Sequence, residues 1–123
     1  MYEGYKELNV WKESMKLGGE IYRLTNNFPA NEKFGLTSQM QRCAVSIPSN
    51  IAEGWSRNYD KVFIQFLNTA QGSAAELESQ LIIAAELKYT TEDLVAELLK
   101  IVIIIKKMIR SLIQSIQSKI NSK

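Results

Sequence analysis

The side chains in this sequence that could do chemistry are mainly cations near the C-terminus. Residues 100–123 contain six basic residues and no acidic one, so all 13 acidic residues of the chain precede them. Repeated Lys and Arg contacts to phosphates drive non-specific nucleic-acid binding. For one protomer, solvation of a helix face is the simpler explanation, because the whole chain carries a net charge of only +2. The candidates for nucleic-acid contact are Lys106, Lys107 and Arg110, followed by the weaker candidates Arg42, Arg57 and Lys61.

A second group of polar side chains shares one side of the segment 36–55. Two interpretations remain open for this polar line. It is either a structural network, in which Arg42 and Glu53 each meet a partner such as Glu76 or Glu78 on the following segment, or a small polar site for a ligand or partner. A helical projection aligns Arg42, Ser46, Ser49 and Glu53, with Gln39 and Asn50 at the edge. The residues assigned to the polar line and its kink are Arg42, Ser46, Pro48, Asn50, Glu53 and Glu76.

Pro48 falls in the middle of this polar line. A proline inside a helix removes one backbone hydrogen bond, here to the carbonyl of Ala44, at a cost of roughly 3 kcal/mol. We therefore predict a kink at Ser46–Pro48, where Ser49 or Asn50 satisfies freed backbone groups.

Enzymatic chemistry is not expected from this composition. The chain has no histidine, which removes the Ser-His and Cys-His pairs and the Glu-x-x-His metal ligands of helical bundles. The lone Cys43 lies on an apolar face and is expected to be a packed thiol. No glycine-rich phosphate loop occurs, so we expect no catalysis and no cofactor or metal. A single cysteine, no signal peptide and no apolar run longer than Ile101–Ile105 predict a cytoplasmic protein.

Apolar periodicity predicts an all-α chain, with residues 1–123 forming a single domain built as an antiparallel four-helix bundle. Gly, Pro and Asn interrupt the sequence at only three places. Expected caps are Asn9 for the first helix, Ser56 or Asn58 for the third, and Thr90 or Thr91 for the fourth. The predicted helices cover about Val10–Asn26, Leu36–Trp55, Asp60–Lys88 and the stretch that starts after Thr91 and reaches about Ile120.

The last helix carries two adjacent apolar seams. One interpretation is a broad core face with some exposed isoleucine; the other, which we favour, is that the second seam is a subunit interface, because a long uncovered stripe invites association. The first seam consists of Leu94, Leu98, Ile101, Ile105, Met108 and Leu112, and the second of Val95, Leu99, Val102, Ile109, Ile113, Ile116 and Ile120.

Three stretches resemble the family of 23S rRNA intervening-sequence proteins. They are YKELNVWKES at the start, FGLTSQMQRCAVSIPSNIAEGWSR in the middle, and FIQFLNTAQGSAAELESQL after it. The segment SIPSNIAEG is the most specific part. The residues that match the family pattern are Arg42, Ser46, Pro48, Asn50, Glu53, Gly54, Phe66, Leu67, Gly72, Ser73, Glu76 and Leu77.

This resemblance implies an up-down-up-down bundle that assembles as a homopentamer. A similar protein, the accessory variability determinant of diversity-generating retroelements, is a basic pentamer that binds nucleic acid and a reverse transcriptase. By analogy, our leading hypothesis is an oligomeric, non-enzymatic protein that contacts structured RNA or DNA through backbone phosphates. The rival hypothesis is a protein-binding scaffold without nucleic-acid contact, and a small-molecule site at Pro48 ranks third.

Overall fold

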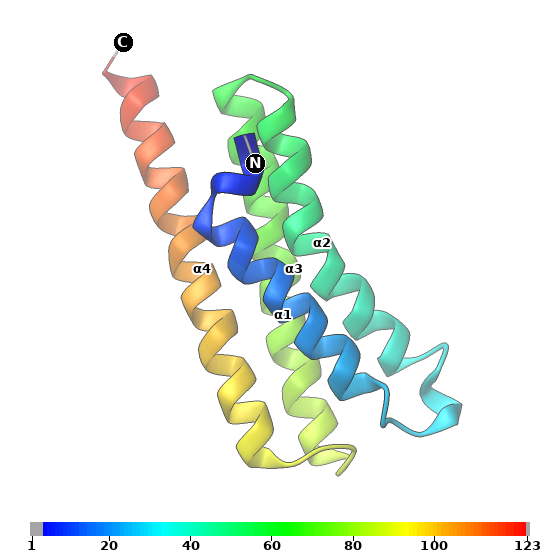
Figure 1. Ribbon diagram of the computed structural model, residues 1–123. Helices are drawn as coiled ribbons and strands as arrows, with labels where there is room; N and C mark the ends of the chain where they lie inside the picture. Colours follow the sequence, from blue (N-terminus) through cyan, green and yellow to red (C-terminus); the bar gives the residue numbers. More distant parts are fainter. Residues whose placement is uncertain (1–3, 123) are drawn as a thin grey trace.

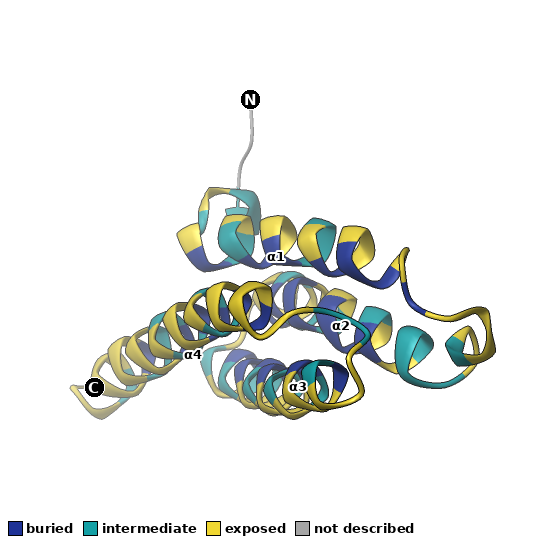
Figure 2. Ribbon diagram, turned by 90° about the horizontal axis from the view of Figure 1, so that it is seen from below, coloured by how far each residue is buried: buried dark blue, intermediate teal, exposed yellow. Residues whose placement is uncertain are grey.

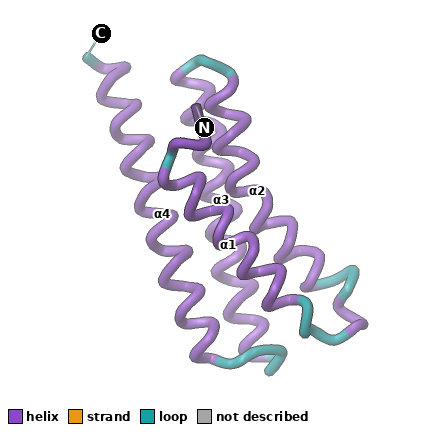
Figure 3. The backbone as a smooth tube through the Cα atoms, viewed as in Figure 1, coloured by secondary structure: helices purple, strands orange, loops and turns teal. Residues whose placement is uncertain are grey.

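The computed structural model describes residues 4–122, and within them every regular element is a helix (Figure 1, Figure 3). The all-α prediction is therefore confirmed. Four α-helices are joined by short connections, and two 3₁₀ turns accompany them. The elements in chain order are η1 Gly4–Glu7, α1 Asn9–Thr25, η2 Ala30–Glu32, α2 Leu36–Ser56, α3 Asp60–Glu86 and α4 Glu92–Asn121.

One predicted cap is present at the start of α4. The hydroxyl of Thr91 accepts a hydrogen bond from the backbone N–H of Leu94 at 3.2 Å, which satisfies one of the donors that a helix N-terminus leaves free. The other two caps were predicted wrongly. Asn9 is already the first residue of α1, and the residue before α3 is Tyr59, which makes no capping bond with its side chain.

The ends of α2 and α3 depart slightly from the sequence prediction. Ser56 belongs to α2, and its hydroxyl donates to the carbonyl of Ala52 at 2.8 Å, so it cannot cap α3. Asn58 has φ 55° and forms the turn between the two helices. Lys88 has φ 62°, a left-handed conformation that ends α3 at Glu86, two residues before the predicted end.

The α1–α2 and α3–α4 connections lie at one end of the molecule, and the α2–α3 connection lies at the other (Figure 1). α2 and α3 pack together most extensively, while α1 contacts α2 and α4. The buried sides of the helices face one another and the exposed residues cover their outward sides (Figure 2). The centre is aliphatic, and its fully buried large side chains include Leu17, Ile21, Met40, Ile47, Ile51, Leu67, Leu77, Leu81, Val102, Ile105 and Ile109.

The second apolar seam of α4 is not the uncovered stripe that we favoured from the sequence. Its members Val95, Val102, Ile109 and Ile116 are buried within the single chain, and the other three are half-buried. The physical reason is that α4 packs against both α1 and α3, so two neighbours cover both sides of its apolar arc. The broad core face is the correct interpretation. Within residues 4–122, no helix combines the length and the apolar character that crossing a membrane requires.

Candidate functional site: the α4 cations and the α2–α3 polar network

Three cations project outward from the middle of α4. Lys100, Lys107 and Arg110 are exposed, and their spacing of seven and three residues places them on one side of the helix. Within residues 4–122, none of the three has a carboxylate partner. We call these three residues the α4 ridge. Of the other basic residues after position 99, Lys119 pairs with Asp60 at 3.5 Å, and Lys123 lies outside the described residues.

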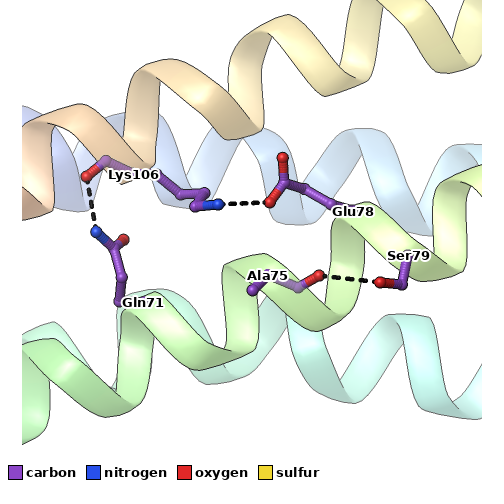
Figure 4. A network of polar contacts seen from close by, with 5 residues as sticks. All are labelled: Gln71, Ala75, Glu78, Ser79 and Lys106. Carbon is purple, nitrogen blue, oxygen red and sulfur yellow. Dashed lines mark hydrogen bonds and ion pairs between the residues drawn. The ribbon is translucent and has the colours of Figure 1, made fainter.

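Lys106 has a different role from its neighbour Lys107. Its Nζ lies 2.6 Å from Oε1 of Glu78 on α3, and the two side chains are only 29% and 25% exposed. The side-chain amide of Gln71 donates to the backbone carbonyl of Lys106 at 3.0 Å (Figure 4). Two polar contacts thus join α3 to α4 on this side. Because Glu78 neutralises its charge, Lys106 is not a free cation for phosphate, and we remove it from the leading candidates.

The three weaker candidates lie on other elements. Arg57 donates to Oε1 of Glu53 at 2.9 Å, and its guanidinium lies 5.6 Å from the centre of the Phe66 ring. Lys61 is exposed in the first turn of α3. Arg42 is exposed on α2 and makes no hydrogen bond or ion pair to any described residue. The structure therefore brings Lys107 and Arg110 together but does not gather all six candidates into one patch.

The polar line of α2 forms a network with α3 around two serines. The hydroxyls of Ser46 and Ser73 are 2.8 Å apart and share a hydrogen bond. The side-chain amide of Asn50 donates to the carbonyl of Ser46 at 2.8 Å and to its hydroxyl at 2.9 Å. α2 continues through Pro48 to Ser56, and Asn50 supplies the extra donor, although to Ser46 and not to Ala44. Asn50 therefore bonds within the polar line, but it does not satisfy the carbonyl of Ala44, which was the role expected from the sequence.

Cys43 extends the network toward the C-terminal half of α3. Its thiol lies 3.6 Å from Oε2 of Glu76, and the amide of Gln80 donates to its sulfur at 3.5 Å. Burial raises the pKa of the Cys43 thiol, and the negative charge of Glu76 adds to this effect against the bond from Gln80. The thiol therefore stays protonated at neutral pH and donates to Glu76. Cys43 is thus a packed thiol, as expected from the sequence.

The partners within the network differ from those that we named from the sequence. Glu53 pairs with Arg57 on its own helix, and Glu78 pairs with Lys106. Sequence reasoning missed Ser73 and Gln80 as network members. Ser73, Glu76 and Gln80 are spaced three and four residues apart, the pattern of a single helix face, and this spacing was the available signal.

An apolar groove lies between α1 and α2, and Pro48, the position of the third-ranked small-molecule hypothesis, is one of its walls. It has a volume of about 550 Å³, and its walls include Trp11, Met15, Tyr22, Val45 and Pro48. We call it the α1–α2 groove. A volume of this size is in the range of ligand or side-chain binding sites. Among residues 4–122, no three His, Cys, Asp or Glu side chains come close enough together to hold a metal ion.

These features define a class: a helical protein of four α-helices, whose α2 and α3 are joined by the polar network around the Ser46–Asn50 segment. The chain belongs to the 23S rRNA-intervening sequence protein family, whose model matches residues 6–111. The resemblance inferred from the three sequence stretches is thereby confirmed.

A solved structure also resembles this chain in its fold. The chain is similar to a protein with unknown function from the S23 ribosomal protein family of Bacteroides thetaiotaomicron, with 26% sequence identity and a TM-score of 0.76. The alignment covers 85% of this chain and 97% of that protein. No curated protein matches this chain.

Proposed function

We propose that this protein is a non-enzymatic, cytoplasmic binding protein that contacts structured RNA or DNA through backbone phosphates. The α4 ridge is the observation that carries this proposal. Lys107 and Arg110 are exposed, are not neutralised by any described carboxylate, and lie in a part of the chain that contains no acidic residue. Lysine and arginine side chains of this kind bind phosphates by charge and confer no base specificity.

Self-assembly completes the proposal, because one protomer offers only a small positive patch. The protomer is an antiparallel up-down-up-down bundle, and its copies form the homopentamer that the family resemblance implies. Each copy contributes the same α4 ridge, so the number of phosphate contacts grows with the number of copies that face one nucleic acid. The weak phosphate contacts of the single copies then combine, so the assembly binds nucleic acid more tightly than one protomer does.

The experiment is a binding titration by fluorescence anisotropy, with a labelled RNA hairpin and a labelled DNA duplex across a series of salt concentrations. Binding through phosphates predicts that the logarithm of the affinity falls linearly with the logarithm of the salt concentration. The slope of this line should be roughly −0.9 for each phosphate contacted on duplex DNA. We expect the double variant Lys107→Ala/Arg110→Ala to reduce this slope by about 2 for each protomer in contact.

The matched control is Lys16→Ala/Arg23→Ala, which also removes one lysine and one arginine charge, but from α1. These two cations form exposed ion pairs with Glu13 and Glu20, whose loss changes stability by at most about 1 kcal/mol. The control should keep the salt slope of the unmodified protein. Absence of binding at low salt, or equal slopes for both double variants, would overturn the nucleic-acid proposal.

A protein-binding scaffold is the second candidate function, and one observation favours it. The α1–α2 groove is mainly apolar, and Met15, Tyr22 and Val45 on its walls are each more than 40% exposed. Exposed apolar surface of this kind marks protein contacts more often than nucleic-acid contacts. If the protein shows no affinity for either nucleic acid at low salt, this second function takes the place of the first.

A further inference from the structure

Two glycines in the middle of helices have no reason to be glycine within the chain. A Cβ atom added at Gly18 in α1 or at Gly72 in α3 would meet no other heavy atom within 4 Å. Gly54 in α2 shows the contrast, since a Cβ there would lie 2.6 Å from Cβ of Phe66 on α3. A glycine in a helix interior costs about 1 kcal/mol relative to alanine. Packing within one chain does not explain why positions 18 and 72 are glycine, so we look for a reason in a contact with another molecule.

Gly18 is one of the residues that line the α1–α2 groove. Around it, Met15, Tyr22 and Val45 are 49%, 47% and 44% exposed. A smaller depression that contains Arg42 shares the walls Tyr22 and Val45 with this groove and extends it along α2. Because position 18 has no side chain, another backbone can approach the groove closely at this point.

Gly72 lies on an outward side of α3 that is exposed along several turns. Small side chains occupy its centre, with Ile83 one turn beyond them. Such a surface allows a helix to approach without a projecting side chain in the way. We call this surface the α3 outer face, and its residues, all exposed, are Asn68, Gly72, Ala75, Glu76, Ser79, Ile83 and Glu86.

The charges of the two surfaces are complementary. Arg42 lines the depression that continues the groove along α2, and it has no carboxylate partner among residues 4–122. The α3 outer face carries Glu76 and Glu86, and the sequence contains no basic residue between Lys61 and Lys88. Pairing either surface with its own copy would bring like charges together. Pairing the groove with the α3 outer face brings opposite charges together, which favours that contact.

We propose that the α1–α2 groove receives the α3 outer face of a second copy of this chain. The contact joins two different surfaces, so it is head-to-tail, and each copy keeps one groove and one face for further neighbours. Such contacts close into a ring when the rotation between copies permits. The α4 ridge belongs to neither surface and stays exposed in this assembly. The inference rests on the self-assembly in the proposed function and identifies the surfaces that produce it.

Cross-linking between two single-cysteine variants tests the inference directly. In a Cys43→Ser background, one variant carries Gly18→Cys and the other carries Gly72→Cys, and both substitutions enter open space. The variants are mixed and treated with a short bis-maleimide reagent. We expect cross-linked pairs of chains in the mixture and few in either variant alone. The matched control mixes Gly18→Cys with Ser118→Cys, an exposed α4 position outside both surfaces, and should give no cross-linked pairs.

Charge reversal tests the same contact by measuring the strength of association, without introduced cysteines. Arg42→Glu places a carboxylate beside the groove and should weaken association about tenfold or more in light scattering. Arg110→Glu, on the α4 ridge, should leave association unchanged, and circular dichroism should show native helicity for both variants.

The outcomes separate this inference from the proposed function. Cross-linking of Gly18→Cys with itself, or an oligomer that gives no cross-link between positions 18 and 72, overturns the groove assignment alone. A chain that is monomeric at micromolar concentration overturns the self-assembly as well.

Discussion

Lys106 and Lys107 are neighbours in the sequence, yet only the charge of Lys106 is paired with a carboxylate. Lys106 is largely buried against Glu78 between α3 and α4, whereas Lys107 projects from the outward side of α4. One step along a helix rotates a side chain by about 100°, which is enough to move it from a packed seam to solvent. At the scale of single residues, the proposed contact with phosphates therefore depends on which cations remain unpaired.

The Lys106–Glu78 pair is expected to stabilise the fold and to have no part in nucleic-acid binding. Lys106→Met leaves the Glu78 carboxylate largely buried without a partner, so the free energy of unfolding should fall by about 1–2 kcal/mol. The double variant Lys106→Met/Glu78→Met removes both charges and should recover most of this loss. Urea denaturation measures both values. If the single and double variants are equally destabilised, the pair does not have the role assigned to it.

Glu32 links the start of α2 to the α3–α4 connection. Its pKa therefore depends on Tyr89, which is close in space but far away in the sequence. Its Oε1 accepts the backbone N–H of Leu36 at 3.0 Å, and its Oε2 accepts the hydroxyl of Tyr89 at 2.8 Å. The bond from Leu36, and after it the bond from Tyr89, lower the pKa of the Glu32 carboxyl below its ordinary value of 4.5. The stability from this lowered pKa is present above pH 4.5 and is lost as pH falls through the folded-state value.

We expect Tyr89→Phe to raise the pKa of Glu32 toward 4.5, because the variant keeps the ring and removes the hydroxyl donor. The bond from Leu36 remains, so the rise should be partial. An NMR titration of the Glu32 side chain measures it. Tyr59→Phe removes an exposed hydroxyl elsewhere and serves as the control. A Glu32 pKa that is the same in both variants would refute the role of Tyr89.

At the scale of elements, the contact between α2 and α3 depends on how closely their backbones approach. These two helices make the most extensive contact of the bundle, and Gly54 is the point where a side chain does not fit. Phe63 and Phe66 occupy the space beside it, at 3.0 and 2.6 Å from the position of an added Cβ. The aromatic rings of α3 therefore fill the volume that the glycine of α2 leaves free.

Gly54→Ala is expected to lower the free energy of unfolding by about 1–3 kcal/mol, because the new methyl group forces the two helices apart or displaces Phe66. The matched substitution Gly19→Ala should instead raise it by about 0.5–1 kcal/mol, through helix propensity. The nearest atom to a Cβ there is the flexible end of Arg23, at 3.3 Å. Chemical denaturation distinguishes the two signs, and a stabilising Gly54→Ala would contradict the close-approach argument.

At the scale of the whole molecule, charge and assembly are coupled. The net charge of +2 is too small for one chain to bind a polyanion strongly, so the proposed function needs several copies to present their α4 ridges together. The coverage of the second α4 seam within one chain shifts the expected contact between copies away from that seam. In the proposed assembly, α1, α2 and α3 make the contacts between copies, which leaves α4 available.

Assembly predicts that stability depends on protein concentration. Association with a second copy stabilises only the folded state, so the thermal unfolding midpoint should rise as the concentration increases from about 1 to about 100 µM. Circular dichroism in cells of different path length measures this midpoint. We expect Arg42→Glu to abolish the dependence and Arg110→Glu to retain it. A midpoint that is constant over this range for the unmodified chain would argue against assembly.

The sequence by itself determined the four helices and the family and placed the cap of α4 at Thr90 or Thr91. Helix periodicity, capping and the SIPSNIAEG motif depend on residues that are close together in the chain. The sequence offered Ser49 or Asn50 as donors near Pro48 but did not determine the acceptor, which for Asn50 is Ser46. Only the tertiary structure decided that Lys106 pairs with Glu78, that the second seam of α4 is covered, and that a groove is open beside Gly18. Each of these depends on which helix lies alongside and how closely it packs, and residues far apart in the chain set that geometry.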